Sequence, residues 1–102
     1  MNKGWYITDG FPYVLDLTDC KDWDDLHNRI RTLFAFPDYY GENWNAMWDC
    51  LNDLFRKDDH GEIIIRGTAT MPEEMKEDIE DLKAVFSDLR AKRCPGILCR
   101  FE

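Results

Sequence analysis

Two carboxylates and two amides recur in the segment 43–55 at the spacing of one helical face. The set consists of Asn45, Asp49, Asn52 and Asp53. An α-helix places residues three and four positions apart side by side. The carboxylate pair Asp49 and Asp53 could then bind a divalent ion or act as general acid and base, as in a metal-dependent hydrolase. Because the sequence adds no paired histidine, glycine-rich phosphate loop or nucleophile motif, we predict that the protein is not an enzyme.

The residues just before this segment are suited to a contact surface. Tyr39, Tyr40 and Gly41 lie shortly before Asn43 and Trp44. Tyrosine rings offer a large rigid contact area at small entropic cost, and their hydroxyl groups tolerate a polar rim. An aspartate flanked by short amides and rimmed by tyrosines is typical of an interface anchor. The same residues also fit a turn and a core helix of a scaffold domain, with one tyrosine pointing inward, so the pattern alone leaves both interpretations open.

The net charge restricts the class of partner. The chain of 102 residues has 13 Lys and Arg against 21 Asp and Glu, a formal net charge of −8. A surface of this sign repels nucleic acid and anionic membranes on average, so we expect neither as a direct partner. A basic protein is the natural complement. The length and the 44% hydrophobic content fit one globular domain over residues 1–102.

Localisation and thiol chemistry are predicted together. The N-terminal stretch MNKGWYITDGF lacks the apolar region and cleavage pattern of a secretory signal. Apolar runs such as 63–65 are far shorter than the roughly 20 residues that cross a bilayer. We therefore expect a cytoplasmic protein, in which cysteines normally stay reduced. The four predicted free thiols are Cys20, Cys50, Cys94 and Cys99.

A structural metal is not expected either. The sequence contains no Cys-x-x-Cys pair, and His27 and His60 lie in unrelated segments. Zinc sites in proteins are usually built from such closely spaced ligands. We predict that the protein requires no metal and no other cofactor.

Hydrophobic periodicity predicts helices that alternate with strands. We expect strands at 13–17, 62–66 and 97–101, helices at 23–34 and 43–55, a long helix between Thr70 and Cys94, and an extra edge strand at 5–7. Asp22 is the expected N-cap of the first helix, and Thr70 with Glu73 forms a possible capping box for the third. In the second helix, Leu54 is expected on the buried face.

The order of these elements predicts the fold class. Strand, helix, helix, strand, helix, strand implies right-handed crossovers and a small three-stranded parallel sheet packed with helices, an α/β fold. The all-apolar run 63–65 is typical of a central strand that is buried on both faces. With two helices between the first two strands, one side of the second helix is free to face a partner.

The stretch FPDYYGENWNAMWDCL, residues 36–51, resembles the barstar family, intracellular inhibitors of the bacterial ribonuclease barnase. The resemblance is carried by Pro37, by residues 39–43, by Ala46 and by residues 48–51. Weaker matches extend it across most of the chain, at Leu26, His27, Val85, Phe86 and Cys94. The resemblance implies a barstar-like fold, which agrees with the architecture expected from periodicity.

The resemblance also implies a mode of action. In that family the second helix and the loop before it enter the nuclease active site, which implies contacts for Tyr39, Asn43 and Asp49, with Asp49 in place of a substrate phosphate. Asp88, in the third helix, falls where the family has another acidic contact. The implied partner is a basic ribonuclease, either barnase-like or a nuclease domain of a delivered toxin. The protein would then be an immunity protein or antitoxin that is monomeric when free.

Two departures from the family pattern alter the expected surface. Asn45 stands where barstar has an acidic residue, and Leu54 stands where it has a tryptophan. The loss of one contact charge lowers complementarity to a barnase active site. We therefore expect that the cognate nuclease can differ from barnase.

Overall fold

A parallel sheet of three strands forms one layer of the computed structural model, which describes residues 11–102. The strands are β1 (Tyr13–Asp16), β2 (Gly61–Arg66) and β3 (Ile97–Phe101), in the order β1-β2-β3. Leu15 pairs with Ile65 in the register of β1 and β2, and Ile63 pairs with Cys99 in that of β2 and β3. The predicted α/β class, the parallel sheet and the central position of β2 are confirmed.

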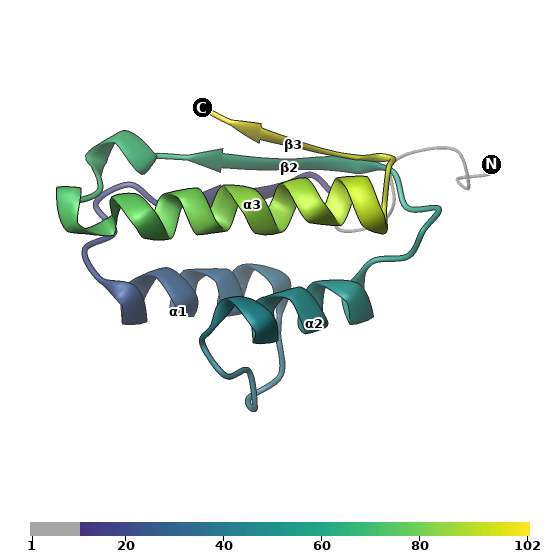
Figure 1. Cartoon of the computed structure of the whole chain (residues 1–102), viewed down its shortest axis with the longest axis horizontal. Helices are drawn as coiled ribbons and strands as arrows, with labels where there is room; N and C mark the ends of the chain where they lie inside the picture. Colours follow the sequence, from purple (N-terminus) through teal and green to yellow (C-terminus); the bar gives the residue numbers. More distant parts are fainter. Residues whose placement is uncertain (1–10) are drawn as a thin grey trace.

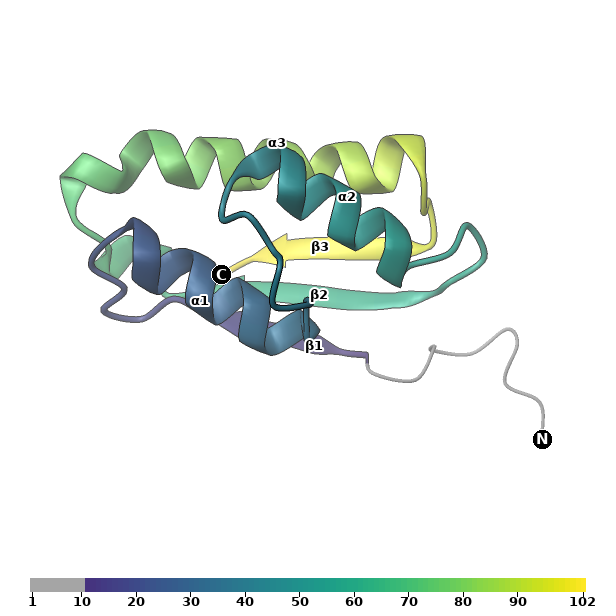
Figure 2. The same ribbon diagram turned by 90° about the horizontal axis from the view of Figure 1, so that it is seen from below.

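Three helices lie on the same side of this sheet (Figure 1). They are α1 (Trp23–Phe34), α2 (Trp44–Leu54) and α3 (Lys76–Lys92). Figure 2, which views the molecule from the helical side, shows α2 lying in front of the sheet and beside α3. This arrangement leaves the outer side of α2 uncovered by the other helices, as the element order predicted.

The ends of α1 follow its sequence signals. The Asp22 side chain accepts a hydrogen bond from the Asp25 N–H at 2.8 Å, which confirms the predicted N-cap. The helix ends at Ala35, which has a left-handed backbone with φ of 54° and donates its N–H to the carbonyl groups of Arg31 and Thr32. The helix therefore stops before Pro37, and the chain enters the loop that leads to α2.

The predicted capping box at the start of the third helix is wrong. The Thr70 hydroxyl donates to the Gly67 carbonyl and accepts from the Asp19 N–H, each at 2.7 Å. These bonds hold Thr70 at the end of a 3₁₀ turn, Thr68–Thr70. A second 3₁₀ turn, Glu73–Met75, follows Pro72, and α3 begins only at Lys76 without a side-chain cap. Helix α3 is therefore shorter than predicted, and its buried residues are Leu82, Val85, Phe86 and Leu89.

The core lies between the sheet and the three helices. Its largest fully buried side chains are Leu15, Leu17, Leu26, Ile30, Met47, Leu51, Ile63, Ile65, Leu82, Phe86, Leu89 and Ile97. Every helix and strand contributes to this set, and burial of such side chains supplies most of the favourable free energy of folding. The alternation of β3 turns Cys99 and Phe101 toward the helical side, whereas Leu98, 49% exposed, points away from it.

Two further predictions concern the ends of the chain and the thiols. The edge strand expected at 5–7 lies outside the described residues. All four cysteines are free, with Cys20 and Cys94 buried and Cys50 and Cys99 partly buried. Within residues 11–102, none of the helices has the length and apolar content required to cross a membrane.

Candidate partner-binding site

The loop between α1 and α2 is held by the cap of α2. The Asn43 side-chain oxygen accepts from the Ala46 N–H at 2.7 Å, and its amide nitrogen donates to the Gly41 carbonyl at 3.1 Å. The two bonds join the loop to the first turn of the helix. A Cβ at Gly41 would lie 3.2 Å from the Asn43 amide nitrogen, which is a tight contact. The roles of Gly41 and Asn43 in the free protein are therefore to shape the loop.

The two adjacent tyrosines point in opposite directions. Tyr39 is 83% exposed, whereas Tyr40 is only 6% exposed and belongs to the core. The Tyr40 hydroxyl is hydrogen-bonded to Nδ1 of the buried His27. The structure thus corrects the assignment of Tyr40 to the contact surface and confirms that one tyrosine points inward. Tyr40 anchors the loop, and Tyr39 is the ring that the loop presents to solvent.

Aromatic rings surround His27 beneath this loop. The ring centroids of Trp23 and Trp44 lie 4.1 Å and 5.0 Å from the ring centroid of His27. The rings of Trp23 and Trp44 meet edge to face, with 5.5 Å between their centroids. Trp44, predicted as a contact residue, is thus partly buried against the core. The Nε2 atom of His27 has no hydrogen-bond partner among the described residues. Burial lowers the pKa of His27 to about 4, against a smaller opposing effect of Asp24, because a charged imidazolium would be poorly solvated there.

The stability of the protein is expected to depend on this histidine in mildly acidic solution. Unfolded His27 binds a proton below a pKa of 6.5, whereas the folded state stays neutral down to about pH 4. The contribution of neutral His27 to the free energy of unfolding should therefore be complete above pH 6.5. As the pH falls from 6.5 to about 4, the free energy of unfolding should decrease by about 3 kcal/mol. Urea denaturation at a series of pH values measures this loss.

The matched variant for that experiment is His27→Asn. Asparagine cannot be protonated in this range but offers an oxygen near the position of Nδ1 to accept from the Tyr40 hydroxyl. The variant should be less stable at neutral pH because it leaves a cavity, and its stability should change little between pH 6.5 and 4. An unaltered pH slope in this variant would assign the titration to another group.

The outward face of α2 is acidic. Asn45, Asp49 and Asp53 are exposed, as the helical spacing predicted. Among residues 11–102, no ion pair involves Asp49 or Asp53. Burial raises the pKa of the Cys50 thiol between them, and the negative charges of Asp53 and Asp49 raise it further. This face therefore presents two uncompensated carboxylates beside a neutral thiol.

The last turn of α2 differs from the expectation. Leu54 was assigned to the buried face but is 37% exposed. It borders a hollow of about 190 Å³ that is also lined by Pro37, Tyr39 and Asp53. Sequence reasoning missed Leu54 as a surface residue, since its spacing from Met47 fits the core face. The residue lies at the rim because the helix ends there, where the loop after α1 leaves space.

Asn52 and Asp88, the two remaining predicted contacts, are placed differently. Asn52 is half-buried, and its amide donates to the Trp48 carbonyl at 2.7 Å, so much of its bonding capacity is used within α2. Asp88 is exposed on α3 and forms an ion pair with Lys92 at 3.8 Å. The side of α3 that carries Lys83 and Arg90 lines a groove against β3. Helical spacing puts Asp88 on a different side of α3 from this groove.

The carboxylate pair does not extend into a metal-binding cluster. In the part of the chain that the structure describes, no group of three or more His, Cys, Asp or Glu side chains is arranged to hold a metal ion. The hollow beside Asp53 is lined by this one carboxylate and otherwise mostly by apolar side chains. The metal-dependent hydrolase considered from the sequence finds no support in this geometry.

Comparison with known proteins finds a relative and a matching protein family. YrdF of Bacillus subtilis (strain 168), a protein provisionally assigned as a ribonuclease inhibitor, is 42% identical over 38 residues. This match covers 37% of the present chain and 42% of YrdF. The model of the barstar family, described as barnase inhibitors, matches residues 11–98, a range that includes β1, β2, the three α-helices and the candidate site, and the start of β3. The chain belongs to the barstar family.

Proposed function

We propose that the protein inhibits a ribonuclease by covering the active site of the enzyme with helix α2 and the loop that precedes it. One observation carries this proposal: the loop presents an 83% exposed Tyr39 next to a helix whose Asp49 is exposed and, among residues 11–102, free of ion pairs. Membership of a family of barnase inhibitors supports the same conclusion. The protein would act by binding and would catalyse nothing itself.

The chemistry of a ribonuclease explains why a carboxylate suits this role. Such an enzyme concentrates positive charge and hydrogen-bond donors where the phosphate of RNA reacts. A carboxylate in that position accepts the same donors through charge-assisted hydrogen bonds. Asp49 is the proposed substitute for the phosphate, Asp53 and Asp88 supply further negative charge, and Tyr39 packs against the rim of the active site. Asn45 and Asn52 offer amides for polar contacts.

The two departures from the family pattern support a partner that differs from barnase. Asn45 lacks the negative charge found at its position in barstar, and the exposed Leu54 stands where barstar has a tryptophan. We therefore propose a basic ribonuclease other than barnase, such as the nuclease domain of a delivered toxin, with the present protein as its immunity protein. It would act in the cytoplasm as a monomer, without a cofactor.

Inhibition is tested by titrating the protein against a ribonuclease with a fluorogenic RNA substrate. Barnase and any ribonuclease encoded beside the gene are the enzymes to compare. The activity of the cognate enzyme should fall in proportion to the added protein and reach zero at one equivalent, because each active site is covered by one inhibitor. The proposal would be abandoned if both enzymes kept full activity in excess protein, or if the protein itself cleaved RNA.

The acidic surface should also control the rate of association. Opposite charges on inhibitor and nuclease accelerate their encounter, an effect already established for barnase with barstar, and salt screens this attraction. We expect the association rate constant to fall steeply as the ionic strength rises from about 0.01 M to 1 M, while the dissociation rate constant changes less. Stopped-flow fluorescence measures both, and an association rate that ignores salt would leave the charge of −8 as a solubility feature only.

A further inference from the structure

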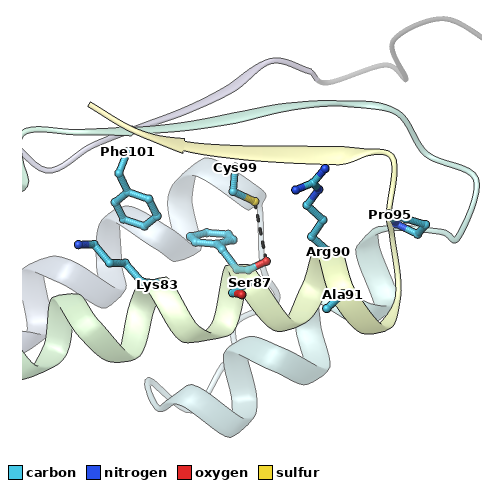
Figure 3. A pocket seen from close by; sticks show the side chains of 8 residues that line it. Lys83, Ser87, Arg90, Ala91, Pro95, Cys99 and Phe101 are labelled. Carbon is cyan, nitrogen blue, oxygen red and sulfur yellow. Dashed lines mark hydrogen bonds between the residues drawn. The ribbon is translucent and has the colours of Figure 1, made fainter.

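A second surface, unrelated to α2, lies between helix α3 and the edge strand β3. A groove of about 600 Å³ runs along this side of the molecule (Figure 3). Lys83, Ser87 and Arg90 line it from α3, and Cys99 and Phe101 line it from β3. The Phe101 ring lies beneath Lys83, whose ammonium is 5.5 Å from the ring centre. None of the residues predicted to bind the nuclease lines this groove.

The backbone of β3 is available along the edge that borders the groove. The Gly61 N–H donates to the Gly96 carbonyl and the Glu102 N–H donates to the Ile65 carbonyl. In a parallel pair, alternate residues direct their backbone groups toward the same neighbour. The N–H groups of Cys99 and Phe101 therefore point to the outer edge, where, among residues 11–102, they meet neither a hydrogen-bond acceptor nor a further strand. Such an edge is a template for an added strand.

The groove is basic although the protein as a whole is acidic. Lys83 forms an exposed ion pair with Glu80 at 3.6 Å, and Arg90 has no ion pair among residues 11–102. Seven residues separate the two cations, which is about 10.5 Å along a helix. Side chains two and four residues apart on one face of a strand are separated by about 7 and 13 Å. The flexible stems of lysine and arginine accommodate this difference, so both can reach acidic side chains of an added strand.

We infer that this groove binds an extended acidic segment of another protein, which adds to β3 as a fourth strand. Its backbone would pair with the free amides of Cys99 and Phe101. Its carboxylates would meet Lys83 and Arg90, and an apolar side chain between them would contact Phe101. The site does not depend on the proposed ribonuclease and lies on the side of α3 that faces away from α2. The protein could then hold a nuclease and an acidic partner at the same time.

Charge distinguishes this occupant from a second copy of the chain. Antiparallel pairing of β3 with β3 of a copy would bring two α3 helices together on one face of a six-stranded sheet. Lys83 and Arg90 of each copy would then face the same cations of the other, and such like-charge contacts oppose association. An acidic strand meets no such repulsion in the groove.

Fluorescence polarisation with a labelled peptide tests the inference directly. The probe is a seven-residue peptide with glutamate at positions 2 and 6, valine at position 4 and threonine at the odd positions, compared with versions that carry lysine or serine in place of glutamate. We expect the glutamate peptide to bind at least tenfold more tightly than the serine peptide, and the lysine peptide not to bind. Equal binding of the three peptides, or no binding of the glutamate peptide up to about 1 mM, would overturn the proposal.

Charge reversal in the protein provides the matched comparison. The variant with Lys83→Glu and Arg90→Glu should bind the glutamate peptide at least tenfold more weakly than the wild type. The variant with Arg56→Glu and Lys57→Glu has the same change of net charge at exposed loop positions and should differ less than twofold. Circular dichroism checks that each variant is folded. If both variants bound the glutamate peptide equally weakly, the effect would come from net charge alone, which would contradict a local site.

Pairing of the backbone has its own test, which leaves the protein unaltered. Methylation of alternate peptide nitrogens removes donors from one edge of the added strand only. One of the two methylation patterns should abolish binding and the other should be tolerated, whereas binding in a non-strand conformation would show no such alternation. Analytical ultracentrifugation completes the test, because a wild-type dimer that the peptide dissociates would assign the edge to a second copy.

Discussion

Replacement of Asp49 by Ala is expected to weaken binding of the ribonuclease by at least 2 kcal/mol, about thirtyfold in Kd, with little effect on folding. The side chain is exposed on α2, and no other residue in the range 11–102 forms an ion pair with it. Its removal should therefore change the free energy of unfolding by less than about 1 kcal/mol. In the complex, however, the cationic groups of the enzyme would lose their principal acceptor.

The experiment combines inhibition titrations with thermal melts of each variant. Glu77→Ala is the control, since Glu77 is an exposed carboxylate in the first turn of α3 and lies outside the proposed contacts. Its loss should change affinity by less than about 0.5 kcal/mol. If Asp49→Ala inhibited as strongly as the wild type while melting normally, Asp49 could not be the group that replaces phosphate.

The second large effect should separate the two adjacent tyrosines. Tyr40→Ala is expected to lower the free energy of unfolding by about 3 to 5 kcal/mol, because it empties a ring-sized space in the core and removes the hydrogen bond to His27. Tyr39→Ala should leave stability within about 1 kcal/mol, since its ring is 83% exposed, and should weaken nuclease binding instead. Tyr40→Ala should thus mainly change stability, and Tyr39→Ala should mainly change nuclease binding.

Denaturant unfolding and inhibition assays on both variants measure this separation. Tyr40→Phe serves as the intermediate case, since it keeps the ring and leaves His27 Nδ1 without its partner, at a cost of about 1 to 3 kcal/mol. Equal destabilisation by Tyr39→Ala and Tyr40→Ala would contradict the inward position of Tyr40. Full inhibition by Tyr39→Ala would remove that ring from the proposed contact surface.

Most of the architecture could be predicted from the sequence because local signals and periodicity agree. Asp22 and Asn43 cap their helices because their side-chain oxygens accept hydrogen bonds from backbone N–H groups of the first turn. The apolar run 63–65 forms the central strand. The start of α3 could not be predicted in this way. Thr70 has the residue type of a cap, but its hydroxyl bonds to Gly67 and to the distant Asp19, which is a tertiary contact.

The residues of the candidate site could be predicted from the sequence, but whether each side chain points to the surface or to the core was harder to predict. Tyr39 and Tyr40 are identical in type and adjacent, so only the path of the loop over His27 decides which one is buried. Leu54 satisfies the apolar spacing of α2 and is nevertheless at the surface, because burial there depends on the loop after α1. The position of Asp88 relative to α2 is likewise set by the packing of two helices and not by either helix alone.

The anchoring of the loop has a thermodynamic consequence. Tyr40 is buried at one point of the loop, its N–H donates to the Pro37 carbonyl at 2.9 Å, and Asn43 bonds to both the loop and the helix. A segment fixed at these points has little conformational entropy left to lose when it meets a partner. Its contact residues are already ordered before the encounter, so affinity for a nuclease would be limited by the fit of two rigid surfaces and not by the ordering of a flexible one.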